Sequence, residues 1–162
     1  MSQAKAIPER SQIAPEFTWN TADLYPTDQA WQEDFSRLQA MVPKLAACAG
    51  RLGESADALY AYVTLEQEAG ELLVKLMDYA QRRSDEDTRV PEYQAMVGKI
   101  TSQYVALSQA VSFEIPEVLR IPTETLERFY EEKPELELYR RYFTIIQDRR
   151  EHTLSDAEEK LL

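Results

Sequence analysis

The stretch SADALYAYVTLEQEAGELLVKLMDYA, residues 55–80, decides the fold class. Its apolar residues recur every three or four positions, which is the spacing of one face of an α-helix. At a rise of 1.5 Å per residue, some 27 residues make a helix of about 40 Å, so we predict a long bundle helix that Ser55 caps. Its buried face should consist of Leu59, Tyr62, Leu65 or Glu66, Ala69, Leu72, Leu73, Leu76, Tyr79 and Ala80.

A helix is predicted on either side of this one. Thr27 or Asp28 is a suitable cap for the first, and Gly50 and Gly53 should end it; its apolar face is Trp31, Phe35, Leu38, Val42 and Leu45. Pro43 falls inside that pattern and should kink the helix or split it near Val42. The charged run 82–89 is expected to form the next turn.

The third helix should open at Pro91, because proline suits the first helical position. It carries Tyr93, Met96 or Val97, Ile100, Tyr104, Leu107 and Val111 on one face, and we expect it to end at Pro116. Two shorter helices follow, one from Pro122 or Thr123 and one from Pro134.

The predicted class is therefore all-α, an antiparallel bundle of about three long helices followed by shorter C-terminal helices. The scarcity of turn residues agrees, since the chain has only four glycines and one asparagine. We divide the 162 residues into a flexible lead-in (1–15), a three-helix antiparallel bundle (16–114) and short helices (115–162).

The last eight residues contain a helix start without a helix behind it. Ser155 and Glu158 form a capping-box pattern, and Leu161 and Leu162 begin an apolar face. Because such a short helix is not stable alone, we expect the chain to be part of a longer protein.

Charge and cysteine content exclude several classes of function. Eighteen basic and 29 acidic residues give a net charge of −11, which disfavours nucleic acid and anionic membranes as partners. Cys48 is the only cysteine, so no intrachain disulfide is possible. Neither a signal-peptide pattern nor a long apolar run is present, and a cytoplasmic location is expected.

The search for catalytic chemistry yields no catalytic and no metal-ligating residue. His152 is the sole histidine, so H-E-x-x-H is impossible, and its pairing with Asp148 is best interpreted as a surface contact. Adjacent carboxylates such as Glu131 and Glu132 lie in hydrophilic runs, which favours solvation over acid–base work. Cys48 has no placed histidine partner and is interpreted as a small apolar residue or an idle thiol.

Eight of the nine tyrosines divide into two groups by their position in the helical pattern. Five fall on apolar faces and are expected in the core or at its edge, namely Tyr62, Tyr79, Tyr93, Tyr104 and Tyr142. Tyr60, Tyr130 and Tyr139 lie off these faces and are predicted to contact something outside this segment.

Four segments, in order, resemble the opening of the oligoendopeptidase F family. They are EFTWNTADLYPTDQAW (16–31), YAQRRSDEDTRVPEYQAM (79–96), IPTETLERFYEEKPELELYRRYF (121–143) and HTLSDAEEKLL (152–162). The resemblance therefore covers nearly the whole chain, from about Glu16 to Leu162.

The resemblance implies a zinc metallopeptidase, related to thimet-type oligopeptidases, that cuts short peptides in a closed helical cavity. The H-E-x-x-H helix of that family lies downstream of anything matched here, so no catalytic or metal residue can be carried over. The chain would be the N-terminal lobe that walls and covers the substrate channel. It would bind no cofactor itself, and the full-length protein would bind zinc. Its partners would be the catalytic domain of the same parent chain and, for that parent, short peptides as substrates. The candidate contacts with that domain or with the substrate channel are Tyr60, Tyr130 and Tyr139.

A different function fits the same helices. A free-standing helical adaptor that binds a protein partner also needs no catalytic groups. Under either interpretation we expect the chain alone to be inactive. If it is a lobe removed from its enzyme, the apolar surface left uncovered should make the isolated segment self-associate through its last helices.

Overall fold

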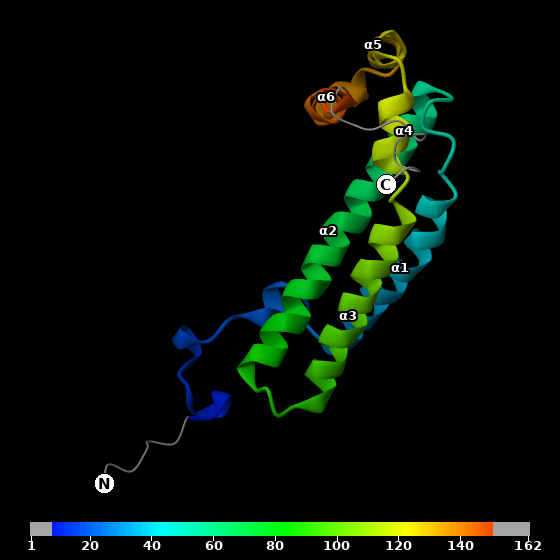
Figure 1. Cartoon of the computed structure of the whole chain (residues 1–162). Helices are drawn as coiled ribbons and strands as arrows, with labels where there is room; N and C mark the ends of the chain where they lie inside the picture. The colour runs from blue at the N-terminus through cyan, green and yellow to red at the C-terminus, as the bar shows by residue number, and fades with distance from the viewer. Residues whose placement is uncertain (1–7, 151–162) are drawn as a thin grey trace. The chain divides into compact units, whose positions relative to one another are not determined.

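The computed structural model describes residues 8–150, and this part of the chain consists of helices joined by turns and short loops, with no β-strand (Figure 1). The all-α class is thereby confirmed. The predicted capping box at Ser155 and the residue His152 lie outside the described residues. The helices are η1 (Arg10–Gln12), η2 (Pro15–Phe17), η3 (Thr21–Asp23), α1 (Asp28–Ala46), α2 (Ala56–Glu86), α3 (Pro91–Ala110), α4 (Glu114–Arg120), α5 (Thr123–Glu132), η4 (Pro134–Tyr139) and α6 (Arg140–Gln147).

The described residues belong to two compact units. Unit 1 consists of residues 8–42 and 68–107, and unit 2 of residues 43–67 and 108–150. Both units draw on α2, because the boundary falls at residue 67 within that helix. Among residues 8–150, no helix has the length and apolar composition needed to cross a bilayer.

Unit 1 is built on the antiparallel pairing of α1 with the second half of α2. Trp31, only 1% exposed, donates from its indole nitrogen to the carbonyl of Leu76 at 2.9 Å. At one end of the pairing the Tyr79 hydroxyl donates to Asp28 at 2.6 Å. The Trp31 ring also stacks on Phe35, with ring centroids 5.1 Å apart. The large apolar side chains of this core are thus fixed by directional contacts as well as by burial.

The α2–α3 connection completes unit 1. The Arg83 guanidinium lies over the ring of Tyr93 and donates to its hydroxyl, and Gln94 donates to Ser84 at 3.2 Å. Met96 and Ile100 of α3 are buried. Figure 1 shows α2 and α3 side by side along this part of the molecule.

Unit 2 combines the turn after α1, the first half of α2 and the short helices α4–α6. Its core comes from all of these segments. The fully or almost fully buried side chains are Leu45, Leu52, Leu59, Tyr62, Val118, Phe129, Leu136 and Phe143. Gln147 at the end of α6 donates to the carbonyls of Val118 and Ile121, at 2.9 and 2.8 Å, and so satisfies the end of α4.

The helix starts predicted from local sequence signals are confirmed. Thr27 caps α1 by accepting from the Ala30 backbone, and Ser55 caps α2 by accepting from the Ala58 backbone. Pro91 is the first residue of α3, and Thr123 opens α5.

The predicted split of the first helix at Val42 is wrong. The helix α1 continues through Pro43 to Ala46, and Ala47 still donates to the Pro43 carbonyl at 3.1 Å. Proline costs the helix one backbone hydrogen bond. Ending the helix at Val42 would cost more, because Leu45, which is completely buried, would no longer lie on the apolar face of α1.

Two predicted ends are also corrected. The helix α2 runs into the charged segment as far as Glu86, because pairs such as Gln81 with Asp85 and Asp78 with Arg82 lie four residues apart and support a helix. The helix α3 ends at Ala110, and Pro116 instead lies in the first turn of α4, where a missing N–H costs no intrahelical bond.

Candidate functional site

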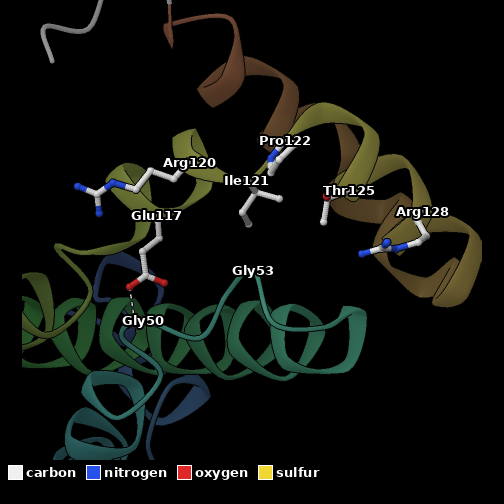
Figure 2. A pocket seen from close by; sticks show the side chains of 8 residues that line it. All are labelled: Gly50, Gly53, Glu117, Arg120, Ile121, Pro122, Thr125 and Arg128. Atoms are coloured by element: carbon white, nitrogen blue, oxygen red, sulfur yellow. Dashed lines mark hydrogen bonds between the residues drawn. The ribbon is translucent and has the colours of Figure 1, made fainter.

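Unit 2 holds a cavity of about 440 Å³ beside the turn that follows α1 (Figure 2). The turn contributes Gly50 and Gly53. The other lining residues come from α4, α5 and their junction and are Glu117, Arg120, Ile121, Pro122, Thr125 and Arg128. Gly50 adopts a positive φ of 82°, a conformation that glycine permits at little cost.

The charged side chains of this cavity are occupied by structural contacts. Glu117 accepts from the backbone N–H groups of Gly50 and Leu52, the latter at 3.3 Å, and so holds the turn against α4. Arg128 pairs with Glu132 at 3.5 Å. Figure 2 shows the Arg120 side chain directed away from Thr125 and Arg128. We therefore assign this cavity a structural role.

The three predicted contact tyrosines all lie in unit 2, in three different surroundings. Tyr60 is half-buried beneath the ammonium group of Lys133, 5.0 Å from its ring. Tyr139 is half-buried and donates to Gln67 at 2.7 Å. Tyr130 is only 5% exposed and lies beneath Arg140, with the guanidinium 4.0 Å from the ring centroid.

Tyr130 lines the second cavity of unit 2. This cavity of about 400 Å³ lies between α5 and α6, and Tyr130 lines it together with Leu126, Thr144 and Gln147. That these three tyrosines contact groups outside this segment stays a prediction.

A carboxylate cluster is the most unusual chemistry of unit 2. It consists of Tyr62 and Glu66 on α2, Glu114 on α4 and Tyr142 on α6. The Tyr142 hydroxyl donates to Glu114 at 2.8 Å. Glu114 is only 7% exposed, Glu66 is half-buried, and Tyr142 is 45% exposed, so the cluster has a buried side and an open side.

Burial dominates the electrostatics of this cluster. It raises the pKa of the Glu114 carboxyl, and hydrogen bonding from the tyrosine side opposes that effect only in part. Burial also raises the pKa of Glu66, and the negative charge of Glu114 raises it further. The pKa values of Tyr62 and Tyr142 are raised as well, again mainly by burial. Two neighbouring carboxyl groups thus share a site in which ionising both is unfavourable.

The sequence contained a partial signal for this cluster. Glu66 is one of the two alternatives for its turn of the apolar face of residues 55–80, and Glu114 stands between Phe113 and Ile115. Carboxylates that are adjacent in the sequence pair with arginine instead. In the acidic run 85–87, Glu86 pairs with Arg10 at 2.6 Å although its side chain is only 13% exposed, and Asp87 pairs with Arg89 at 2.6 Å.

A zinc ion does not fit the described residues. Across 8–150, no three histidine, cysteine, aspartate or glutamate side chains are grouped so that they could hold a metal. A protein zinc site takes three or four such ligands. The half-buried Cys48 thiol donates to the Lys44 carbonyl, four residues earlier, at 3.4 Å.

Comparison with known proteins places these helices among peptidases. The family described as Oligopeptidase F matches residues 117–162. Oligopeptidase PepF of Bacillus subtilis is 37% identical over 160 residues, which are 99% of this chain and 24% of that protein. Group B oligopeptidase PepB of Streptococcus agalactiae is 30% identical over 94% of this chain and 26% of its own length.

Solved structures give the same result. The crystal structure of oligoendopeptidase-F from Enterococcus faecium superimposes with a TM-score of 0.69 and 29% identity, over 84% of this chain and 27% of that one. A protein from Chlamydophila abortus, at 24% identity, shares the fold with a TM-score of 0.82 over 96% of this chain. The fold is therefore that of an N-terminal peptidase domain. The chain belongs to the oligoendopeptidase F family and spans about a quarter of the length of its relatives.

Proposed function

We propose that this chain is the non-catalytic N-terminal lobe of an oligopeptide-cleaving zinc metalloendopeptidase, and that it walls and covers the substrate channel. The observation that carries the proposal is the match of 99% of the chain to 24% of an oligopeptidase. In this proposal the zinc and the groups that activate water belong to the part of the parent protein that this chain does not match. The lobe contributes by excluding water and large substrates, which is an effect of shape.

Exposed apolar side chains in both units support a role in covering another surface. In unit 2, Leu138 is 79% exposed, and Ile115 and Ile145 are also largely open. In unit 1, Phe17 is 77% exposed and Trp19 is open as well. Burying such side chains against a neighbour stabilises each contact in proportion to the area removed from water. The neighbour that we propose is the catalytic domain of the same parent chain.

Tyr60, Tyr130 and Tyr139 are proposed to meet that domain or a peptide in the channel. Tyrosine suits either contact, because its ring offers apolar area while its hydroxyl keeps a polar partner. Tyr60 and Tyr139 are half-buried and so keep part of their surface available for such a contact, whereas Tyr130 would act through the cavity between α5 and α6.

Peptide cleavage by the purified 162-residue chain tests the non-catalytic part of this proposal. With added zinc and a quenched fluorescent peptide, we expect no turnover above that of a blank preparation. Zinc-dependent turnover that follows the chain through size-exclusion chromatography would contradict it. Mixing the chain with the catalytic portion of a relative should give binding, whereas an adaptor would bind unrelated proteins and leave that portion alone.

A further inference from the structure

The side of α2 that faces away from the core of unit 1 is apolar. Val74 lies on the opposite side of the helix from the buried Leu72 and Leu76, and it is 60% exposed. Met77, three residues further on, is 37% exposed. A surface helix of a globular protein carries polar or charged residues on this side. We call the surface formed by Gly70, Val74 and Met77 the outer face of α2.

A shallow groove of about 530 Å³ lies on this outer face, entirely within unit 1. Its lining residues are Leu24, Gly70, Glu71, Val74, Lys75 and Asp78. A Cβ added to Gly70 would meet nothing within 4 Å. Glycine inside a helix is less stable than alanine, and it permits another backbone to approach closely. The groove therefore has room for a second helix directly over Gly70.

The charges beside this groove are compensated within unit 1. The Lys75 ammonium lies 4.1 Å from the centre of the Tyr25 ring and 4.0 Å from the Asp34 carboxylate. Asp78 pairs with Arg82 at 3.6 Å. Because these two charged groups already have partners, the groove favours an apolar occupant over an ion.

Two open aromatic side chains extend the same surface beyond Arg82. Phe17 is 77% exposed and Trp19 is 56% exposed, and together with Ile13 they line a second cavity of about 270 Å³. The Arg82 guanidinium lies 4.0 Å from the centre of the Trp19 ring, and Arg10 donates to the Trp19 carbonyl at 3.1 Å. A ring that its own chain already holds in place loses little conformational freedom when a partner covers it.

We propose that an apolar α-helix from the part of the parent protein that this chain does not match docks along the outer face of α2, with Phe17 and Trp19 at its end. The length of the chain identifies this occupant, because the chain spans only about a quarter of its relatives and most of the parent lies outside it. A helix fits because Gly70, Val74 and Met77 follow the alternating spacing of four and three residues at which two helices interlock. The docking site rests on the function proposed above.

Fluorine nuclear magnetic resonance of the chain labelled with 5-fluorotryptophan tests this surface. The chain has two tryptophans, and Trp31, which is only 1% exposed, serves as the internal control. The probe is unlabelled Bacillus subtilis oligopeptidase PepF without the quarter that this chain matches. We expect the Trp19 signal to shift when the probe is added and the Trp31 signal to stay in place. A Trp19→Phe variant assigns the two signals.

The possible results of this titration separate the docking site from the function. Binding that leaves the Trp19 signal in place would overturn the docking site and leave the lobe function standing. No binding at all would overturn both. A Trp19 signal that shifts equally with the concentration of the chain alone would identify a second copy as the occupant and overturn the assignment to the parent protein.

A matched pair of valine variants tests the groove itself. Val74→Glu changes the outer face of α2, and Val105→Glu changes an exposed position of α3, where the valine is 48% exposed. Both variants of the isolated chain should unfold at the same urea concentration as the parent, because neither side chain is buried. Binding of the probe should weaken about tenfold or more in V74E, which corresponds to about 1.4 kcal/mol, and stay unchanged in V105E. Equal weakening in the two variants would overturn the proposal.

A chimera tests the docking without a truncated oligopeptidase that has to fold. Gly70→Ala and Gly98→Ala both add a methyl group in open space, so both should raise the Tm of the isolated chain. In oligopeptidase PepF that carries this chain in place of its matched quarter, G98A should still raise the Tm. G70A should lower it, because the methyl group meets the docked helix. Stabilisation of the chimera by both variants would overturn the docking over Gly70.

Discussion

The two units of this chain hold their polar groups beside the core in different ways. In unit 1 the Trp31 indole donates to Leu76, and the carboxyl groups of Asp28 and Glu86 each pair with an arginine. In unit 2 burial raises the pKa of the carboxyl groups of Glu66 and Glu114, and Glu114 accepts from the Tyr142 hydroxyl at 2.8 Å. Burial favours the neutral form of a carboxyl group, so ionising it lowers the stability of the fold. We therefore expect the stability of unit 1 to depend on packing and directional contacts, and that of unit 2 to depend on pH.

Removing the central aromatic side chain of unit 1 should have the largest effect. Trp31→Ala deletes a fully buried ring, its stacking on Phe35 and its hydrogen bond to Leu76. We expect a loss of about 3–5 kcal/mol in the free energy of unfolding, measured by urea denaturation. Trp31→Phe keeps a ring and should lose less. A Trp31→Phe variant as stable as the parent would show that the indole hydrogen bond of unit 1 contributes little.

Neutralising Glu114 should change stability in a pH-dependent way. Because the folded-state pKa of this carboxyl lies above its usual 4.5, its protonated form favours folding below pH 4.5, and that contribution is lost as the pH rises through the folded-state value. Glu114→Gln should therefore gain stability relative to the parent between pH 4 and pH 7, by about 1.4 kcal/mol per pKa unit of the shift. Urea denaturation across this range measures it. Glu131→Gln is the control, and parallel profiles for E114Q and the parent would refute the buried-acid account.

Two glycines should respond to alanine with opposite signs. Gly50 in unit 2 has a φ of 82° and nothing within 4 Å of an added Cβ, so Gly50→Ala should cost about 1–2 kcal/mol through backbone strain alone. Gly98 in α3 of unit 1 also has open space around an added Cβ. Gly98→Ala should stabilise the chain by about 0.5–1 kcal/mol, since alanine is the better helix former. Thermal unfolding measures both, and a shift of the same sign in the two variants would contradict the assigned backbone conformations.

The sequence predicted those features of the structure that depend on residues close together in the chain. Caps and helical faces are local, so Thr27, Ser55 and Pro91 were identified as helix starts. The split near Val42 that Pro43 was one of two ways to produce does not occur, because burial of Leu45 outweighs the lost hydrogen bond in the folded protein. Tyr104 lies on a predicted core face but is 51% exposed, whereas Gln103 beside it is buried.

The carboxylate cluster could not be predicted from spacing. Its two acids are separated by 48 positions, from 66 to 114, and α6 adds Tyr142 to them. Only the fold brings these side chains together and removes them from water. The sequence shows Glu114 between two apolar residues, which indicates burial but names no partner.

Replacing the matched quarter of Bacillus subtilis oligopeptidase PepF by this chain tests the central claim most directly. The measurement is the cleavage rate of a series of peptides of increasing length, with a folded protein as the largest substrate. If this chain is a channel lobe, the chimera cleaves short peptides and leaves the folded protein intact, and the oligopeptidase without its matched quarter loses this discrimination. A truncated oligopeptidase that folds and keeps the same rates and the same length limit as the chimera would contradict the account.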